Sequence, residues 1–300
     1  NREHLSSTAM AEVLNHHCPT GKIIGIEPHK HGPVYAVSQA FETIDENLPT
    51  IVNYCDFTCY WDYGRFKRWL QDCGADGCVP AYRGFHPHSL GSTNYAFMRV
   101  EDGWMREIQE KKPFTSNKIE EFASSGTYYF SQGRHVKRFF TEIMAKDQSI
   151  NGEFYCSIAY NLMVDAGLSV AVYELQHFMQ WGTPEDLTEY MRWSDAFRAL
   201  ATLATPLPPS VGSTLIPMAG RGSRFAQAGY VTPKPLLPVS GLPMVVQAAR
   251  SLPATENYHF VVLGEHFNTN EVQASVTKQF PGAGFTLLDA VTDGQACTCL

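Results

Sequence analysis

Two glycines and two cations late in the chain could together bind a phosphate group. Gly220 and Gly222 follow an apolar run, residues 214–218, that predicts a buried strand. Glycine has no side chain, so the loop can wrap closely around an anion and offer it backbone amides. Arg224 and Lys234 then add two positive charges about ten residues apart, as a polyphosphate requires. The alternative is a glycine turn followed by two solvated cations.

A carboxylate earlier in the chain could hold a divalent cation. Asp56 follows a β-branched run, residues 50–54, that predicts another buried strand. Open α/β sheets bind ligands at the carboxyl ends of their strands, and an aspartate there suits Mg²⁺ that bridges phosphate oxygens. The local sequence fits a helix-cap or turn aspartate equally well.

The elements that would position these residues form two domains. Strands and helices alternate through residues 1–198 and again through residues 214–300, which predicts an α/β fold with a mostly parallel central sheet and helices on both faces. The segment between them, residues 199–213, is rich in proline and small residues and is predicted to be a linker. Near the start, we expect a helix over residues 1–20 and a strand over residues 22–26.

Composition excludes several classes of protein. A net charge of −7 argues against a non-specific nucleic-acid binder, which needs a basic face. No apolar run has the length of a membrane span and no signal peptide opens the chain, so we expect no membrane partner. Eight cysteines without framework spacing predict reduced thiols and a cytoplasmic protein. The sequence leaves a homo-oligomer open.

The full pattern around the glycines is more specific than the glycines alone. G-x-G-[ST]-R-F from Gly220, followed by P-K-P-L from Pro233, resembles the signature of the sugar-phosphate nucleotidyltransferases, or nucleotide-sugar pyrophosphorylases. The resemblance implies a Rossmann-like three-layer nucleotidyltransferase fold, a nucleoside triphosphate and a sugar 1-phosphate as substrates, and Mg²⁺ as cofactor. It implies nucleotide binding by Ala219, Gly220, Gly222 and Ser223, and catalytic roles for Arg224 and Lys234.

The same resemblance assigns residues in the first part of the chain. It implies that Asp56 holds the metal and that Lys111 acts catalytically on the sugar phosphate. The sugar-phosphate side would be bound by Glu110, Gly126, Glu153 and Thr183. Two positions depart from the family pattern, because Lys112 displaces a proline and Gln180 stands where many members have a second metal-binding aspartate. Either the metal relies on Asp56 and the phosphates, or activity is altered or weak.

A repeat links the two ends of the chain. An offset of 262 residues pairs Glu3-His4 with Glu265-His266 and Gly32 with Gly294, and the resemblance implies that both glycines lie beside the nucleotide base. Residues 1–198 resemble the back part of one nucleotidyltransferase and residues 214–300 the front part of a second. Since the chain starts at Asn1 and ends in an apolar run, we expect a fragment of a longer tandem protein.

Two partial copies could complete each other. We predict a single circularly permuted sheet in which the strand after Thr214 lies beside the strand ending before Asp56, so that Arg224 and Asp56 share a cleft.

The expected reaction needs no nucleophilic side chain. An oxygen of the sugar phosphate is already anionic when it attacks the α-phosphorus and displaces pyrophosphate, so catalysis reduces to alignment and charge neutralisation. The alternative is a weakly catalytic protein that binds nucleotide-sugar in a regulatory role, which Gln180 favours. A Rossmann dehydrogenase is excluded, because Phe225 occupies the third glycine position of G-x-G-x-x-G.

Overall fold

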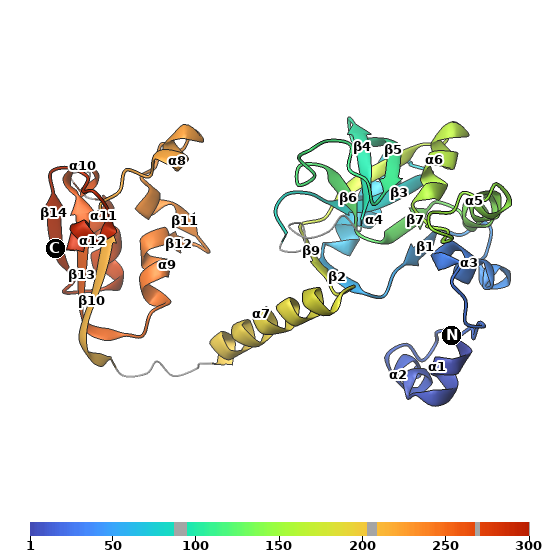
Figure 1. Cartoon of the computed structure of the whole chain (residues 1–300), viewed down its shortest axis with the longest axis horizontal. Helices are drawn as coiled ribbons and strands as arrows, with labels where there is room; N and C mark the ends of the chain where they lie inside the picture. The colour runs from blue at the N-terminus through green and yellow to red at the C-terminus, as the bar shows by residue number, and fades with distance from the viewer. Residues whose placement is uncertain (87–94, 203–208, 268–270, 300) are drawn as a thin grey trace. The chain divides into compact units, whose positions relative to one another are not determined.

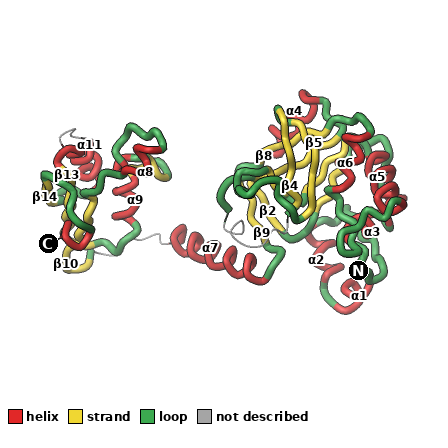
Figure 2. Tube along the Cα trace, turned by 45° about the horizontal axis from the view of Figure 1, so that its top comes forward, coloured by secondary structure: helices red, strands yellow, loops and turns green. Residues whose placement is uncertain are grey.

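The computed structural model describes residues 1–86, 95–202, 209–267 and 271–299 (Figure 1). The chain divides into two compact units, residues 1–198 (unit 1) and 199–300 (unit 2). Each unit combines helices with strands (Figure 2), so the predicted α/β class is confirmed. No helix in the described part of the chain is long and apolar enough to cross a membrane.

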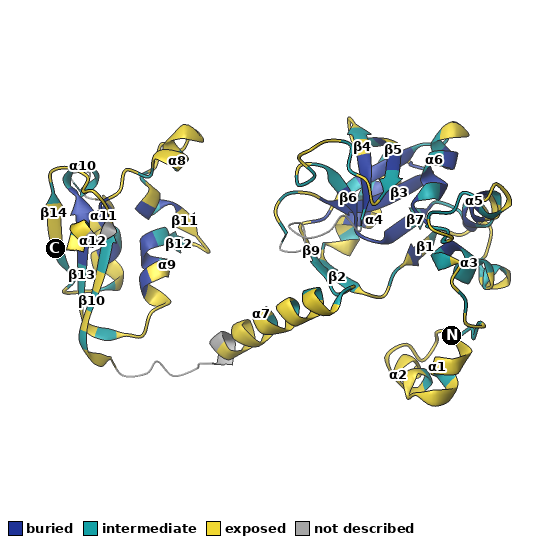
Figure 3. Cartoon of the chain, viewed as in Figure 1, coloured by how far each residue is buried: buried dark blue, intermediate teal, exposed yellow. Residues whose placement is uncertain are grey.

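The beginning of unit 1 differs from the prediction. Two short helices, α1 (Arg2–Ser7) and α2 (Met10–His17), bury no residue (Figure 3). The strand expected over residues 22–26 is absent, and the Arg2 amide instead donates to the Ile26 carbonyl at 2.8 Å. A strand needs a neighbour for its backbone hydrogen bonds, and none of the described strands pairs with this stretch.

Seven strands form the sheet of unit 1 in the order β1-β7-β3-β6-β4-β5-β8, and β8 also pairs with β3. Among the described pairs of this sheet only β3 and β8 run parallel, so the prediction of a mostly parallel sheet is wrong for unit 1. The strands are β1 (Thr50–Asn53), β3 (Gly77–Tyr82), β4 (Ala96–Glu101), β5 (Trp104–Glu110), β6 (Phe122–Ser124), β7 (Thr127–Phe130) and β8 (Val170–Glu174).

Short connections explain the antiparallel pairs. Strands β4 and β5 are joined by Asp102 and Gly103, whose φ angles of 51° and 83° suit a two-residue type I′ hairpin. A parallel neighbour requires a crossover of a dozen or more residues. Helices α5 (Gly133–Ala145) and α6 (Ile158–Asp165) provide such a length of chain before β8.

Helices cover both faces of this sheet. Cys78 and Val79 are adjacent in β3, so their side chains point to opposite faces. Val79 belongs to the core cluster that includes α3 (Gly32–Ser38), α5 and α6, whereas Cys78 packs with α4 (Tyr63–Cys73). Both clusters are buried (Figure 3), and unit 1 is therefore a helix–sheet–helix sandwich.

A small ribbon completes unit 1. Strand β2 (Phe57–Tyr60) pairs antiparallel with β9 (His177–Gln180), which brings residue 57 opposite residue 180. Helix α7 (Pro184–Thr202) follows directly, and a 3₁₀ helix, η1 (Phe41–Thr43), lies before β1. Because α7 continues to Thr202 and the next strand starts at Ser210, regular structure extends into both ends of the linker predicted at 199–213.

Unit 2 is built on three parallel strands in the order β10-β13-β14. The strands are β10 (Ser210–Met218), β13 (Thr255–Leu263) and β14 (Gly284–Leu288). Phe260 and Val262 of β13 form the core with α9 (Met244–Arg250) and α11 (Glu271–Gln279). The remaining elements are α8 (Ser223–Gln227), η3 (Lys234–Leu236), β11 (Pro238–Val239), β12 (Leu242–Pro243), α9 (Met244–Arg250), α10 (Gly264–Phe267), α11 (Glu271–Gln279) and α12 (Gln295–Cys299).

The predicted single permuted sheet is not confirmed. Strand β10 pairs with β13, and β1 pairs with β7, in two different sheets that belong to different units. Each strand finds a partner within its own unit, since α9 provides the crossover between β10 and β13 that parallel pairing requires. Arg224 accordingly lies in unit 2 and Asp56 in unit 1.

Candidate functional site

A cavity of about 250 Å³ in unit 1 gathers most of the candidates from this part of the chain. Five residues predicted from the sequence line it, namely Asp56, Glu110, Lys111, Gly126 and Thr183. They come from the start of β2, the end of β5, the β6–β7 junction and the start of α7. Its other walls are Tyr54, Phe57, Tyr95, Ala96, Ser124, Ser125, Tyr128, Tyr155, Phe178, Gln180 and Gly182.

Asp56 is held beside Gln180 by the β2–β9 ribbon. The Asp56 carbonyl accepts a hydrogen bond from the Trp181 amide at 2.8 Å. A Cβ atom on Gly182 would lie 2.3 Å from Gln180 Nε2 and 3.1 Å from Asp56 Oδ2, so both side chains pack against this glycine. Gln180 therefore lies next to the proposed metal carboxylate, where it offers an amide in place of a second negative charge.

These side chains suit a weakly held cation. No group of three or more histidine, cysteine or acidic side chains in the described ranges could hold a metal ion. Mg²⁺ commonly needs only one or two carboxylates, because water and substrate phosphates complete its coordination. Asp56 is exposed and lines the cavity, so it fits that limited role.

Gly126 occupies a bulge between two strands. Strands β6 and β7 both pair antiparallel with β3, and their registers are offset by the intervening Ser125 and Gly126. Gly126 is buried with φ of 89°, a conformation that favours glycine. Its amide donates to Ser124 Oγ at 3.2 Å. A sugar that contacted this amide would have to share or replace that bond.

Glu110 is a half-buried carboxyl at the end of β5. Its side chain accepts a hydrogen bond from the Ser157 hydroxyl. Burial raises the pKa of Glu110, while Ser157 and the neighbouring Lys111 charge partly offset that rise. The carboxyl is therefore better suited to fixing nearby groups than to facing water.

Lys111 follows in an unusual backbone conformation. Its φ of 58° lies in the left-handed region, which is uncommon for a residue with a side chain and is found disproportionately at functional sites. Its amide donates to the Tyr95 carbonyl at 2.8 Å, and its ammonium donates to the Tyr155 hydroxyl at 2.8 Å. The hydrogen bond to Tyr155 raises the pKa of Lys111, so its positive charge is secured.

Glu153 connects to this group through Tyr155, whose hydroxyl donates to the Glu153 carboxylate. Gly32 packs behind Glu153, because a Cβ at position 32 would lie 2.8 Å from the Phe154 amide nitrogen and 3.1 Å from Glu153 Cβ. The Phe154 amide donates to the His31 carbonyl at 2.9 Å. Gly32 is not among the cavity's lining residues, and its visible role is to let these two backbone segments meet.

Thr183 caps helix α7. Its hydroxyl accepts from the Asp186 amide at 3.1 Å and donates to the Asp186 carboxylate at 2.9 Å. The residue lines the cavity, yet its hydroxyl already serves the helix terminus.

In unit 2 the glycine loop contacts the lysine predicted to act with it. Gly222 has φ of 65°, and a Cβ there would lie 2.9 Å from Lys234 Cβ. Lys234 Nζ lies 5.7 Å from the centre of the Phe225 ring. The loop residue Ala219 is buried and Gly220 is exposed. Close approach of the loop to Lys234 thus depends on glycine at position 222.

The remaining candidates of unit 2 lie on or near the same loop. Ser223 and Arg224 are exposed in α8, which has only five residues and so contributes little helix dipole. Arg221 approaches Glu265 at 3.6 Å. Gly294 precedes α12, and its carbonyl accepts from the Thr298 amide at 3.0 Å. The candidates thus fall into two groups, one in each unit.

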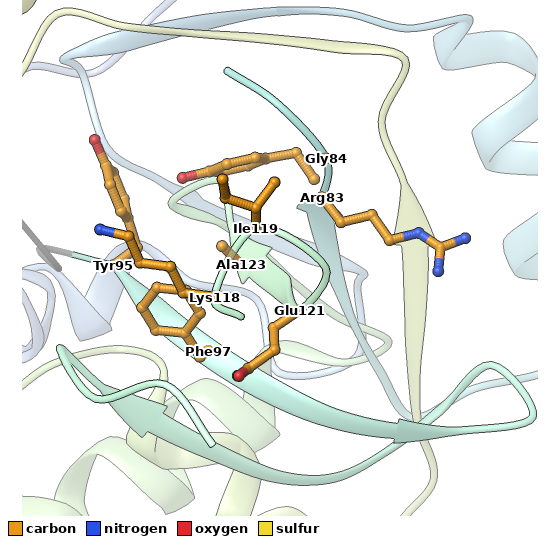
Figure 4. Close-up of a pocket in the computed structure, with 9 residues that line it drawn as sticks. Arg83, Gly84, Tyr95, Phe97, Lys118, Ile119, Glu121 and Ala123 are labelled. Carbon is orange, nitrogen blue, oxygen red and sulfur yellow. The ribbon is translucent and has the colours of Figure 1, made fainter. Parts of the chain in front are cut away.

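A second, much smaller cavity of about 20 Å³ is lined by residues that include Tyr95, Phe97, Lys118 and Glu121 (Figure 4). Its size corresponds to about one water molecule. The Arg83 side chain points away from the other labelled residues and pairs with Glu174 at 2.9 Å. We therefore assign the candidate site to the larger cavity.

Sequence reasoning missed Tyr155 and Ser157, which hold Lys111 and Glu110. No local pattern marks these two residues, because their partners Lys111 and Glu110 lie 44 and 47 positions away along the chain. The aromatic walls Tyr54 and Phe178 had no signal either, because aromatic residues in strands usually belong to a core.

No model of a known protein family matches the sequence, and no curated protein matches it. One similar solved structure is a nucleoside-diphosphate-sugar pyrophosphorylase from Vibrio cholerae RC9, with 17% identity and a TM-score of 0.48 over 63% of this chain and 83% of that one. Another is a candidate glucose-1-phosphate thymidylyltransferase from Bacillus anthracis in complex with a sucrose, with 14% identity and a TM-score of 0.47 over 62% of this chain and 72% of that one. Similarity at this level does not establish a shared reaction.

Proposed function

We propose that the protein is a nucleotidyltransferase that joins a nucleoside triphosphate to a sugar 1-phosphate or a similar phosphorylated alcohol, releasing pyrophosphate. The observation that carries the proposal is the unit 1 cavity, in which the Lys111 cation and the Asp56 carboxylate line one space. Its volume of about 250 Å³ lies below the ~300–1,000 Å³ of pockets for drug-sized ligands, so a small ligand such as a sugar phosphate suits it.

The proposed mechanism assigns the sugar-phosphate end to unit 1. Lys111 would bind the phosphate and hold its attacking oxygen in line with the α-phosphorus, and Glu153 would accept hydrogen bonds from sugar hydroxyls. Glu110, Gly126 and Thr183 would shape the rest of this subsite. Mg²⁺ bound by Asp56 would supply charge neutralisation at the phosphate oxygens.

Unit 2 carries the residues that we assign to binding a nucleoside triphosphate. The loop from Ala219 to Ser223 would offer backbone amides to the phosphates, Lys234 would contact them, and Arg224 would stabilise the departing pyrophosphate. Gly32 or Gly294 would lie near the base.

We also propose that residues 1–38 and 263–300 are two copies of one piece of the fold. The offset of 262 residues maps α10 and α11 onto α1 and α2, and maps α12 onto α3, with helix starts that agree within one residue. Strand β14 maps onto residues 22–26, the stretch that lacks a strand partner. Val272 and Val276, both buried in α11, map onto the exposed Met10 and Leu14 of α2.

One observation favours a second candidate function. Gln180 gives the site beside Asp56 one carboxylate where the resemblance implies two. A nucleotide-sugar binding protein with little or no turnover would have this composition, because binding needs less metal charge than displacement does.

Pyrophosphate release separates the two candidates. The whole chain, with Mg²⁺, each nucleoside triphosphate and a panel of sugar 1-phosphates, should release pyrophosphate. Asp56→Asn should abolish release, whereas Asp72→Asn, an exposed change on α4, should not. Nucleotide-sugar binding without pyrophosphate release across the panel would favour the binding protein, and absence of both would remove both candidates.

A further inference from the structure

Three polar side chains between Glu153 and Ser157 hydrogen-bond with one another or with charged residues of the unit 1 cavity, and Tyr155 itself lines that cavity. Phe154 and Cys156, which lie between them in the sequence, pack in the core cluster. Ser157 bonds Glu110, while Tyr155 bonds both Lys111 and Glu153. Tyr155 is therefore the one described side chain in contact with both charges of this group.

Two hydrogen bonds fix both the donor and the acceptor role of the Tyr155 hydroxyl. It has one proton and accepts through oxygen lone pairs. The proton goes to the Glu153 carboxylate, and the oxygen accepts from Lys111 Nζ at 2.8 Å. An ammonium has three donors, so Lys111 keeps two for a ligand, and Glu153 likewise keeps acceptor capacity.

The exposed Lys111 needs such an anchor. Its backbone is in the left-handed region, and its side chain would otherwise be free to rotate. Its ammonium also lies 4.9 Å from the centre of the Tyr155 ring, a favourable cation–π distance. Because the Lys111 side chain is already ordered before binding, the ligand does not pay the entropy cost of ordering it, and its affinity is higher.

We propose that Tyr155 is a positioning residue that holds the Lys111 ammonium and the Glu153 carboxylate as a pair, so that one ligand places its phosphate on the first and a nearby hydroxyl on the second. This inference rests on the proposed function. The ligand class is a phosphorylated sugar or polyol with a hydroxyl close to its phosphate. A phosphate without that hydroxyl uses only half of the pair.

Calorimetric titration with glucose 1-phosphate and with inorganic phosphate tests this pairing. Tyr155→Phe should weaken glucose 1-phosphate binding about tenfold, in line with the loss of hydrogen bonds to charged groups. Inorganic phosphate should be affected less. Tyr63→Phe, an exposed change on α4, is the control. Equal affinities of Tyr155→Phe and the control for glucose 1-phosphate would overturn the proposal.

A double-mutant cycle tests whether Tyr155 acts through Lys111. In a Lys111→Met background, Tyr155→Phe should cost little further affinity for glucose 1-phosphate, and the same loss as in the original chain would contradict the proposal. If Tyr155→Phe fails to fold, Lys111→Met alone tests the pair, since it should weaken glucose 1-phosphate binding and an unchanged affinity would contradict the proposal.

A second readout needs no ligand. Tyr155, Glu153 and Glu110 are the groups that raise the pKa of Lys111, with Tyr155 first. In side-chain NMR titrations, Tyr155→Phe should therefore lower the Lys111 pKa relative to the original chain. An unchanged Lys111 pKa would overturn the positioning role. Failure of the original chain to bind any sugar phosphate, with the pKa shift present, would instead reject the proposed function and leave the Tyr155 contact established.

Discussion

Replacing Gly126 with alanine tests how tightly the β6–β7 bulge shapes the cavity. The residue is buried with φ of 89°, so alanine would adopt a disfavoured conformation. The new methyl would also lie 3.0 Å from Tyr54 Cδ2 and 3.1 Å from Phe57 Cε1. Both distances are shorter than ordinary van der Waals contact, and both rings line the cavity.

The two costs can be separated with a matched variant. A left-handed residue with a side chain costs ~1–2 kcal/mol, and Gly103→Ala should show this cost alone. Gly103 lies in the β4–β5 turn with φ of 83°, and a methyl group there would have nothing within 4 Å. Overpacking adds ~1–3 kcal/mol. We therefore expect Gly126→Ala to lower the free energy of unfolding by about 2–5 kcal/mol and Gly103→Ala by about 1–2 kcal/mol.

Tryptophan emission is the suitable assay because it reports on one unit. All five tryptophans, Trp61, Trp69, Trp104, Trp181 and Trp193, lie in unit 1. Urea unfolding followed by this signal is therefore not mixed with the unfolding of unit 2. Equal destabilisation by Gly126→Ala and Gly103→Ala would refute the reasoning, since it would mean that Tyr54 and Phe57 move aside freely.

Three further outcomes are expected. Arg224→Ala should reduce turnover about 10²–10³-fold with little change in KM, because the pyrophosphate charge develops during departure. Arg250→Ala, an exposed change at the end of α9, is the control, and a change confined to KM would contradict the role assigned to Arg224. Glu110→Gln should stabilise unit 1 more at pH 7 than at pH 4, measured by tryptophan-monitored urea unfolding. Burial raises the folded pKa of Glu110 above its ordinary 4.5, so its contribution to stability falls as pH rises from that value through the raised pKa. At pH 7 the free energy of unfolding should rise by about 1.4 kcal/mol for each pKa unit by which folding raises the pKa of Glu110. A stabilisation that does not change with pH would reject the raised pKa as its cause. Gly222→Ala should lower the melting temperature, measured by circular dichroism, more than Gly229→Ala does. Both glycines have positive φ, but a methyl group at position 222 would meet Lys234 Cβ at 2.9 Å, whereas one at position 229 would have nothing within 4 Å. Equal shifts would show that Lys234 does not restrict position 222.

Local motifs located much of the candidate site. Asp56 could be identified from the β-branched run before it, whereas Glu110 and Lys111 were assigned only through the resemblance to the nucleotidyltransferases. They line one cavity as a consequence of the sheet. Tyr155 was missed because its importance lies in contacts with residues 44 and 2 positions away, which no spacing rule predicts.

Strand direction and helix ends were harder to predict. Alternation of strands and helices suggested parallel pairing, but Asp102-Gly103 carries the stronger local signal for a hairpin. Residues 22–26 have a strand-like pattern but no partner strand. Whether such a stretch forms a strand depends on a neighbouring strand in the fold, which the local sequence does not specify. Helix α7 passes the predicted boundary because Ala199 to Thr202 still favour a helix and the first proline comes at Pro206.

The thirty residues that open the chain bury no side chain, although α1 and α2 are regular helices. Their tie to the loop that follows is an exposed pair, Arg2 with Glu27, together with a few backbone hydrogen bonds. Exposed ion pairs contribute little free energy. Local opening of this segment therefore costs much less than opening of either unit. Its amides should exchange with deuterated solvent first, and a protease should trim the chain to the vicinity of α3 while both sheets remain folded.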